Sequence, residues 1–492
     1  KSNLAEGAVV GTDESCISVN QFRAMQKNLA QSSISLKGSG DLLNPIWNDR
    51  PPLPDAPVYE HELQYACTDR PSKIEAICSG LDQLGADGQV ITALDDLAWT
   101  FNLRGNDVEC NPVFLAFAYI SRKRTVLFIN SQKLPALLKA KLQVEGIQID
   151  EYDSLPSFLQ KLPSTACILI DPDRTNQSIV KNIPEHCKVI EGLSVPCKLK
   201  AIKTEGEIQN IRQAMRKDGV AMIGFLYWLK NILATHPVDE YLVAQKLIEF
   251  REIQPDYKGI SFFPIVGYKE HGAIVHFHVT AENALPVQKE GFLLFDSGGQ
   301  YLDGTTDITR TIALSELTDQ QKNHFTLVLK GMISLSMAKF PVNTRGYHLD
   351  ILARNPLWQQ NLNYGHGTGH GVGYFLNVHE GPMSIRQEFN EHTIEPGMVL
   401  SNEPGMYLTG EYGIRTENMM ACVKDENTEF GDFLRFDTLT ICPIDTSAID
   451  KNLMTNEEIN WLNNYHLWVY EELEPLIDDE LRIWLKEITL PI

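Results

Sequence analysis

The feature that most constrains this chain is a pair of aspartates that flank a glycine-rich turn in residues 295–311. Asp296 follows an apolar run that is typical of a buried strand, and Asp307 lies in a stretch rich in Thr and Ile that suits a second strand. Glycines between the two supply turn backbone. Two buried carboxylates side by side are costly unless they are paired, protonated or bound to metal. A shared divalent cation is the simplest solution.

The overall composition excludes several classes of protein. A chain of 492 residues is too long for one core, so two or three domains are expected. The net charge of −21 argues against a nucleic-acid partner, and no apolar run approaches the roughly 18 residues of a membrane span. The nine cysteines form no CxxC pair and no signal peptide begins the sequence, which favours reduced thiols in the cytoplasm.

Three regions follow from the pattern along the chain. Residues 1–57 end in a proline-rich linker and are too few for a comfortable domain, so we expect them to be the last part of a larger one. Residues 58–198 alternate helical and strand patterns, which predicts an α/β domain, and contain no nucleotide-binding loop. Residues 199–492 carry the aspartate pair and end in a helical tail.

Individual elements can also be predicted. In the first two regions, helices are expected at 18–29, 71–84, 95–101 and 134–142, and strands at 88–93, 113–120, 125–129 and 166–171. Residues 195–203 are predicted as a linker. Thr204 and Glu207 then form a capping-box pattern that begins a helix, Pro237 is expected to open a second helix through Phe250, and residues 456–486 are expected to be helical.

Four further clusters contain side chains that bind metal. They are GHGTGHGVG with His366 and His370, NVHEGP with His379, SNEPG with Glu403, and GIRTEN with Arg415 and Glu417; His276 lies in a separate segment. Glycines around His370 let the backbone pack closely, and its ring can bind metal through one nitrogen while the other is held by an acceptor.

Asp296, Asp307, His370, Glu403 and Glu417 together offer four carboxylates and one imidazole. This oxygen-rich set suits Mn²⁺, although Zn²⁺ or Co²⁺ could occupy it. Two divalent ions would neutralise four carboxylates, so we infer a dinuclear centre with a bridging water. Taken singly, each cluster has an ordinary explanation: turn aspartates, a hydrogen-bonded histidine, a loop glutamate. The joint occurrence of the clusters favours the metal centre.

These motifs closely resemble the metallopeptidase family that includes aminopeptidase P, prolidase, methionine aminopeptidase and creatinase. The segments FDSGGQYLDGTTDITRT, HGTGHGVG, NVHEGP, NEPG and GIRTEN occur in the family's order. Within the family, the middle-domain run ITALDDLAWTFNLRG and the terminal WLNNYH resemble the long, three-domain, cytosolic-type Xaa-Pro aminopeptidases. The resemblance covers almost the whole chain. It implies an α/β (α+β) protein whose pita-bread catalytic domain follows creatinase-like α/β domains, the first of them incomplete.

The resemblance also implies roles for the candidate residues. The five metal ligands carry over to Asp296, Asp307, His370, Glu403 and Glu417, with Asp307 and Glu417 as the bridging pair. His276, His366 and His379 match the family's non-ligand histidines around the substrate. Arg415 matches an arginine that supports the metal-binding carboxylates.

The implied activity is removal of the N-terminal residue from peptides whose second residue is proline. In the expected mechanism the metal-bound water attacks the scissile carbonyl, Glu403 acts as general base, and His379 helps to stabilise the oxyanion. The peptide amine would lie near Asp296, and His276 and His366 would border the proline pocket.

The resemblance further implies a homodimer, whereas membrane and nucleic-acid partners are not expected. One alternative is a prolidase restricted to Xaa-Pro dipeptides. A non-catalytic binding protein on this fold and a metal-free creatinase-type hydrolase would both lack several ligands, and none is missing here.

Overall fold

The computed structural model describes residues 3–492, which form two compact units. The first is built from residues up to Val108 and from Pro112–Lys200, and the second from Glu109–Asn111 and Ala201–Ile492. Each unit contains both helices and sheets, so the mixed α/β character expected from the sequence is confirmed. The three-part division predicted from the sequence stays a prediction.

A mixed six-stranded sheet forms the centre of the first unit. Its strands are β4 (Gly88–Ile91), β6 (Phe117–Ser121), β7 (Arg124–Phe128), β8 (Ile147–Asp150), β9 (Cys167–Ile170) and β10 (Lys188–Glu191). They are arranged in the order β10-β9-β4-β6-β7-β8, with β4–β6 and β6–β7 antiparallel and the other pairs parallel. Strands β4 and β9 are buried along their whole length, as expected for central strands covered on both faces.

Helices and short strands complete the first unit. The helices are α1 (Val19–Ala30), α2 (Leu63–Ala66), α3 (Arg70–Leu84), α4 (Leu94–Phe101), α5 (Ala136–Val144), α6 (Leu155–Leu159), α7 (Gln177–Lys181) and α8 (Val195–Ala201). Strands β1 (Val9–Thr12) and β2 (Ser35–Gly38) pair in parallel, with α1 between them in the chain. The short strands β3 (Tyr59–Glu60) and β5 (Leu103–Arg104) pair antiparallel.

Two predictions for this unit were wrong. Within the linker predicted over 195–203, residues 195–201 form helix α8 and are not an irregular connection, although the boundary between the two units does fall in that range, after Lys200. The side chain of Lys200 is buried, with its Nζ 3.0 Å from Asp95 Oδ2. The strand predicted from residue 113 begins only at Phe117. The residues before it bond to a neighbouring loop instead: Val113 accepts from the backbone N–H of Asp107, whose side chain accepts from that of Leu115.

Two sheets organise the second unit around the site. Three strands form the first sheet, in the order β13 (Ile265–Tyr268), β15 (Phe292–Ser297), β18 (Ile308–Ala313). Six strands form the second, in the order β19 (Lys339–Pro341), β26 (Gly431–Thr438), β25 (Asn418–Thr428), β22 (Val399–Asn402), β20 (Gly369–Gly371), β21 (Glu380–Ile385). All of these pairings are antiparallel.

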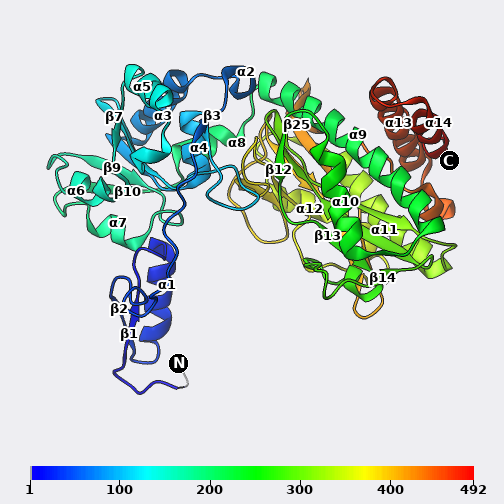
Figure 1. Ribbon diagram of the computed structural model, residues 1–492, viewed down its shortest axis with the longest axis horizontal. Coiled ribbons are helices and arrows are strands. Elements are labelled where there is room, and N and C mark those ends of the chain that lie inside the picture. Colours follow the sequence, from blue (N-terminus) through cyan, green and yellow to red (C-terminus); the bar gives the residue numbers. More distant parts are fainter. Residues whose placement is uncertain (1–2) are drawn as a thin grey trace. The chain divides into compact units, whose positions relative to one another are not determined.

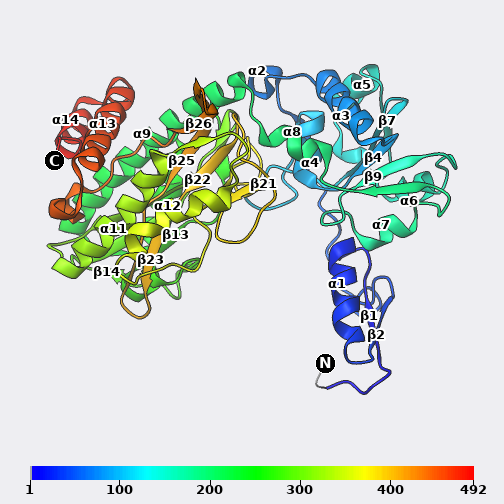
Figure 2. The same ribbon diagram turned by 180° about the vertical axis from the view of Figure 1, so that it is seen from behind.

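Smaller strand groups surround these sheets. They are β11 (Val238–Asp239) with β14 (Pro286–Val287), β12 (Tyr257–Ile260) with β16 (Gly299–Tyr301) and β17 (Gly304–Thr305), and β23 (Gly405–Leu408) with β24 (Tyr412–Arg415). The helices are α9 (Glu205–Thr235), α10 (Glu240–Glu252), α11 (Asp319–Ser336), α12 (Gly346–Trp358), α13 (Asn456–Leu473) and α14 (Asp479–Ile488). Helices α9 and α10 lie side by side, as do α11 and α12, and both pairs pack on strands (Figures 1 and 2).

Helix starts in this unit depend on capping residues. The capping box predicted for Thr204 and Glu207 is confirmed at the start of α9. The helix predicted to open at Pro237 begins instead at Glu240, because Asp239 accepts the N–H of Leu242 as the N-cap while residues 238–239 pair in β11. The predicted helical tail is divided into α13 and α14.

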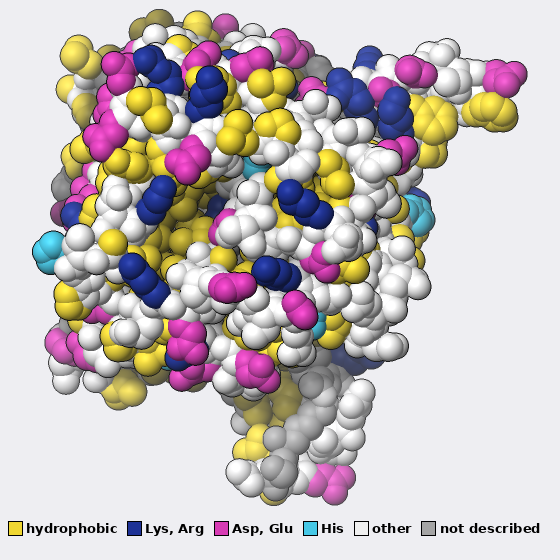
Figure 3. Space-filling model, turned by 90° about the vertical axis from the view of Figure 1, so that its right-hand side faces the viewer, with side chains coloured by type: hydrophobic (Ala, Val, Ile, Leu, Met, Phe, Trp, Pro, Cys, Tyr) yellow, Lys and Arg dark blue, Asp and Glu magenta, His cyan; other side chains and the backbone are white. Residues whose placement is uncertain are grey.

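The surface agrees with the composition. Lys and Arg side chains stand among Asp and Glu on the face drawn in Figure 3, as expected for a chain of net charge −21. Among the helices of residues 3–492, none combines the length and the apolar character that crossing a membrane requires.

Candidate metal centre

Strands β15 and β18 place the two aspartates of the organising stretch. In their antiparallel register Asp296 lies opposite Thr309, and Asp307 directly precedes β18. The two aspartates are only 8% and 5% exposed. The structure therefore brings both carboxylates together in a buried position, as the sequence predicts.

His370 lies on β20, Glu403 directly follows the neighbouring strand β22, and Ser401 links the two. The hydroxyl of Ser401 accepts the backbone N–H of His370 at 3.0 Å and donates to Glu403 Oε1, also at 3.0 Å. The backbone N–H of Glu403 donates to the carbonyl of Thr368 at 2.8 Å. One hydroxyl thus fixes a histidine and a carboxylate with respect to each other.

Glycines make these close approaches possible. A Cβ at Gly369, next to His370, would collide with the backbone oxygen of Ser401. A Cβ at Gly298, in the turn between the two aspartates, would collide with the backbone oxygen of Thr306. Any larger residue at either position would push apart strands that carry candidate ligands.

Glu417 lies between β24 and β25 and faces β18. Its backbone N–H donates to the carbonyl of Thr309 at 3.1 Å, and its Oε2 accepts the Thr309 hydroxyl at 2.8 Å. Thr309 is completely buried. The threonine opposite Asp296 in the register therefore also orients Glu417.

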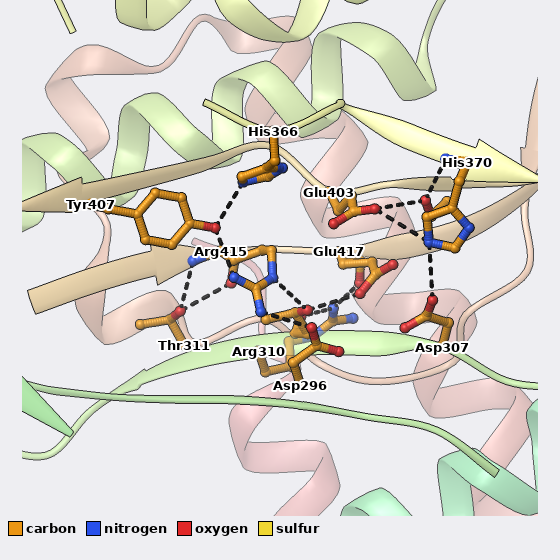
Figure 4. A network of polar contacts seen from close by, with 12 residues as sticks. Asp296, Asp307, Arg310, Thr311, His366, His370, Glu403, Tyr407, Arg415 and Glu417 are labelled. Atoms are coloured by element: carbon orange, nitrogen blue, oxygen red, sulfur yellow. Dashed lines mark hydrogen bonds and ion pairs between the residues drawn. The ribbon is translucent and has the colours of Figure 1, made fainter. Parts of the chain in front are cut away.

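The five side chains converge (Figure 4). Asp307, His370 and Glu417 each offer one ligand atom, and these atoms all lie within 4.8 Å of one another. His370 Nε2 is 3.4 Å from Asp307 Oδ2 and also 3.4 Å from Glu403 Oε1. Four separate segments of the second unit thus contribute to one cluster.

This cluster fits divalent metal ions. Asp296 Oδ1 and Glu417 Oε1 are buried and have no hydrogen-bond partner. A buried carboxylate oxygen without a partner is expensive, and a bound cation removes that cost. His370 donates Nδ1–H to the carbonyl of Gly371 at 2.9 Å, so Nε2 is the nitrogen that faces Asp307 and Glu403, and once it loses its proton it can bind metal.

The pKa values of these groups reflect crowding of negative charge. Burial, reinforced by the charge of Asp307, raises the pKa of Glu417 well above its usual range. Burial also raises the pKa of Glu403 to about 7, although His370 acts in the opposite sense. Burial alone would lower the pKa of His370, but the carboxylates of Asp307 and Glu403 raise it to about 9. The protein itself supplies too little positive charge for this cluster.

Among residues 3–492, Arg415 is the one arginine whose side chain bonds to the side chain of a candidate ligand, whereas Arg310 donates to the backbone carbonyl of Glu417. Arg415 Nη2 donates to Asp296 Oδ2 at 2.7 Å, and its Nη1 donates to the Tyr407 hydroxyl at 2.7 Å. The Tyr407 hydroxyl donates in turn to His366 Nε2 at 2.8 Å, because His366 Nδ1–H is bonded to the carbonyl of Gly367. Both ring nitrogens of His366 are therefore occupied, and burial lowers its pKa to about 4.

A cavity of about 460 Å³ opens onto the cluster. All nine candidate residues named from the sequence line it, including His276, His366 and His379. His379 packs edge-on against His370 with ring centroids 4.3 Å apart. Burial, and then the charge of His370, lowers the pKa of His379. Phe262, Phe263, Val275 and Phe277 give the cavity an apolar wall.

Sequence reasoning missed the residues that orient these ligands. Ser401, Thr309 and Tyr407 bond directly to candidate ligands or to Arg415. The only signal for Ser401 and Tyr407 was their position within four residues of Glu403. Thr309 could have been identified from the β-strand register, because a residue two positions after Asp307 faces the same side of the strand.

Comparison with known proteins identifies both halves of the chain. Residues 49–207 match the Creatinase/Prolidase N-terminal domain, residues 209–424 match Metallopeptidase family M24, and residues 432–492 match the C-terminal region of peptidase M24. A probable Xaa-Pro aminopeptidase P from Coprinopsis cinerea is 37% identical over 98% of this chain and 81% of its own length. One from Tuber melanosporum is 38% identical over 99% of this chain and 83% of its own length.

Solved structures give the same grouping. The X-prolyl aminopeptidase of Caenorhabditis elegans, described as a cytosolic enzyme with a di-nuclear active site, has a TM-score of 0.94 and 33% identity, over 100% of this chain and 82% of its own. A prolidase from Pyrococcus horikoshii has a TM-score of 0.61 and 21% identity, over 76% of this chain and 99% of its own. At that identity the prolidase likeness shows the fold alone.

Proposed function

This chain belongs to the Xaa-Pro aminopeptidase P family of M24 metallopeptidases, and we propose that it removes the first residue from peptides whose second residue is proline. It is a metalloaminopeptidase with a creatinase-like α/β domain and a pita-bread catalytic domain. The observation that carries the activity is the convergence of four carboxylates, three of them buried, and His370 on one cavity, with two carboxylate oxygens lacking a hydrogen-bond partner.

We propose the domain boundaries expected from the sequence: 1–57, 58–198 and 199–492. The match to the creatinase-type domain, residues 49–207, supports the second of these regions, and the matches to peptidase M24 support the third. The first region contributes β1, α1 and β2.

Two divalent metal ions are the cofactors, and we propose Asp296, Asp307, His370, Glu403 and Glu417 as their ligands. Mn²⁺ is the proposed metal because the donor set is one nitrogen and otherwise oxygen. Bound there, divalent ions would supply a water of lowered pKa and a Lewis acid for the scissile carbonyl. Arg415 holds Asp296 in the orientation seen here, and Thr309 does the same for Glu417.

The remaining roles follow from positions around the cavity. Glu403 accepts the proton of the attacking water. The Ser401 hydroxyl donates to Glu403 Oε1 and so fixes the orientation of this carboxylate toward the cluster. His379 donates a hydrogen bond to the developing oxyanion. Asp296 receives the free amine of the peptide. His276 and His366 border the proline ring; because both nitrogens of His366 are occupied, it presents its ring to the substrate and no hydrogen bond.

Three further properties belong to the proposal. The enzyme acts in the cytoplasm, it forms a homodimer, and it binds neither nucleic acid nor membranes. The net charge of −21 supports the absence of a nucleic-acid partner.

The test is hydrolysis of an Xaa-Pro-Pro tripeptide with Mn²⁺, beside an Xaa-Pro dipeptide and an Xaa-Ala-Pro control. We expect the tripeptide to be cleaved far faster than the other two. Preference for the dipeptide would move the assignment to a prolidase. Glu403→Gln should nearly abolish turnover, whereas Glu391→Gln, which changes a glutamate whose side chain is 77% exposed, should not. Wild-type-like turnover of Glu403→Gln would exclude Glu403 as the base.

A further inference from the structure

One wall of the cavity is built from chain that has little regular structure. Residues 275–278, which include His276 and Phe277, line the cavity within the segment between β13 and β14. Only residues 269–273 of that segment form a 3-10 turn, and residues 274–285 belong to no helix or strand. Local hydrogen bonds such as Phe277 N–H to the carbonyl of Ile274 shape the segment, and contacts from outside the segment fix its position against the cavity.

Both ends of the segment are held by one buried carboxylate, that of Glu240. Its Oε1 accepts the backbone N–H of Tyr268 at 2.7 Å, where β13 ends. Its Oε2 accepts the backbone N–H of Leu285 at 2.8 Å, where β14 is about to begin. The backbone N–H of Glu240 donates to the carbonyl of Leu285 at 3.1 Å. Glu240 is 0% exposed.

The same carboxylate also contacts the wall residues indirectly, through His271. Glu240 Oε2 accepts Nδ1–H of His271 at 2.8 Å. The His271 ring stacks on Phe277, with ring centroids 3.9 Å apart and an interplanar angle of 26°. Phe277 directly follows His276 in the chain. A shift of Glu240 would therefore move His271, then Phe277, and with it the backbone that carries His276.

An ordinary role in the helix does not account for these contacts. Glu240 is the first residue of α10, but the helix is capped by Asp239, which accepts the N–H of Leu242. All three donors to the Glu240 carboxylate come from the wall segment or its ends, at residues 268, 271 and 285. The carboxylate therefore acts on the segment and not on its own helix.

We propose that Glu240 is a positioning residue for the aminopeptidase reaction: it clamps residues 268–285 so that His276 and Phe277 face the bound peptide. This inference rests on the proposed function, since it assigns the wall to substrate binding. Glu240 touches neither the substrate nor the metal centre and acts only through the segment that it holds.

The test compares Glu240→Gln with a matched control on the same helix, Glu249→Gln, whose side chain is 53% exposed and pairs with Lys246 at the surface. An amide nitrogen cannot accept, so Gln at position 240 must release either the Tyr268 end or the His271 and Leu285 end. We expect kcat/KM for alanyl-prolyl-proline to fall about 10- to 100-fold, mainly through KM. Mn²⁺ affinity, measured by calorimetry, should change less than about twofold, and hydrogen exchange should accelerate in residues 269–285 alone.

Three results would overturn the clamp: unchanged KM and exchange in Glu240→Gln, a parallel loss of Mn²⁺ affinity, or acceleration of exchange throughout the second unit. If Glu240→Gln does not fold, His271→Phe keeps a ring to stack on Phe277 but removes its bond to Glu240. It should accelerate exchange in residues 269–285 and raise KM by a smaller factor; unchanged values would overturn the proposal. Wild-type protein that cleaves no peptide would refute the function, while the exchange measurement would still decide the clamp.

Discussion

Buried carboxylates occur in both units of this protein, but they are neutralised in different ways. In the first unit, Asp107 forms an ion pair with Lys133, and both side chains are almost completely buried. Lys200 lies 3.0 Å from Asp95 and 3.6 Å from Asp96. In the second unit, Asp296, Asp307, Glu403 and Glu417 face one cavity with only Arg415 and His370 as partners.

The difference separates structural charge from functional charge. A buried ion pair that is complete within the chain holds elements together and needs nothing from outside. An orphaned oxygen alone does not make the difference, because Asp107 Oδ1 of the first unit also lacks a hydrogen-bond partner. The cluster of the second unit sets four carboxylates against one arginine and one histidine, so it is complete only when cations bind. Charge imbalance, and not burial as such, therefore marks the catalytic centre.

The largest effect on activity should come from removing one negative charge from the cluster in the second unit. Glu417→Gln removes one negative charge from the cluster, so we expect about a 1,000- to 10,000-fold loss of tripeptide hydrolysis because metal binding and alignment both suffer. In metal-free protein the same change should raise the free energy of unfolding by about 1 to 2 kcal/mol, because it relieves repulsion among buried carboxylates. Destabilisation of the metal-free protein in urea titrations would contradict the comparison.

The opposite result is expected in the first unit. Asp95→Asn leaves Lys200 buried with a weakened counter-charge, so the free energy of unfolding should fall by about 3 to 5 kcal/mol, measured by urea denaturation. The double variant Asp95→Asn with Lys200→Met should recover most of that loss. If Asp95→Asn is as stable as the wild type, the Asp95–Lys200 ion pair does not stabilise the first unit, and the comparison between the two units fails.

His466 is a third kind of buried ionisable group, one that is kept in its neutral form. It is 0% exposed, its Nε2 accepts the N–H of Ile444, and burial, followed by the charge of Arg310, lowers its pKa to about 4. Its unfolded pKa is about 6.5, so its contribution to stability is present above that pH and is lost as the pH falls from about 6.5 to about 4. The loss should be about 3 kcal/mol over the whole range and about 2 kcal/mol by pH 5. Urea denaturation at pH 7.5 and pH 5 should show a smaller decrease for His466→Gln than for the wild type; equal decreases would refute this assignment.

The smallest effect on metal binding is expected from a neutral hydroxyl that bonds both to a carboxylate and to an arginine of the cluster. The Thr309 hydroxyl donates to Glu417 Oε2 and accepts Arg415 Nε–H at 3.1 Å. Thr309→Val removes this link without changing any charge, and Mn²⁺ affinity should weaken about tenfold, measured by calorimetry. Thr309→Ser keeps the hydroxyl and serves as the control. Equal Mn²⁺ affinity in the two variants would show that Glu417 needs no such support.

The sequence predicts the ligand-bearing strands well because their signals are local. An apolar run, a glycine turn and a stretch rich in Thr and Ile are enough to place Asp296 and Asp307 on paired strands, and the Thr204–Glu207 box fixes the start of α9. The assignment of five ligands needed the resemblance to a family, because no local pattern brings Glu417 beside Asp307.

Two features could not be predicted from the sequence because the partners that decide them are distant in the chain. The range predicted as a linker contains helix α8, whose Lys200 is buried against Asp95, about a hundred positions earlier. The role of Glu240 depends on residues 268, 271 and 285, which belong to a segment without regular structure. The start of α10 was missed for a local reason. Pro237 and Asp239 are both residues that can begin a helix, and Asp239 is the one whose side chain accepts a helix N–H.

The glycines beside the ligands have a consequence for inherited variation in this enzyme. Every amino-acid replacement at Gly369 or Gly298 adds at least a Cβ, and at both positions that atom meets a backbone oxygen of the adjoining chain. Such variants leave all five proposed ligands, Arg415 and the cavity histidines unaltered in the sequence. A screen of natural alleles that inspected only the proposed ligands would therefore classify these substitutions as harmless, although one added methyl group displaces the backbone beside the ligands. Gly369 and Gly298 should be scored together with the proposed ligands.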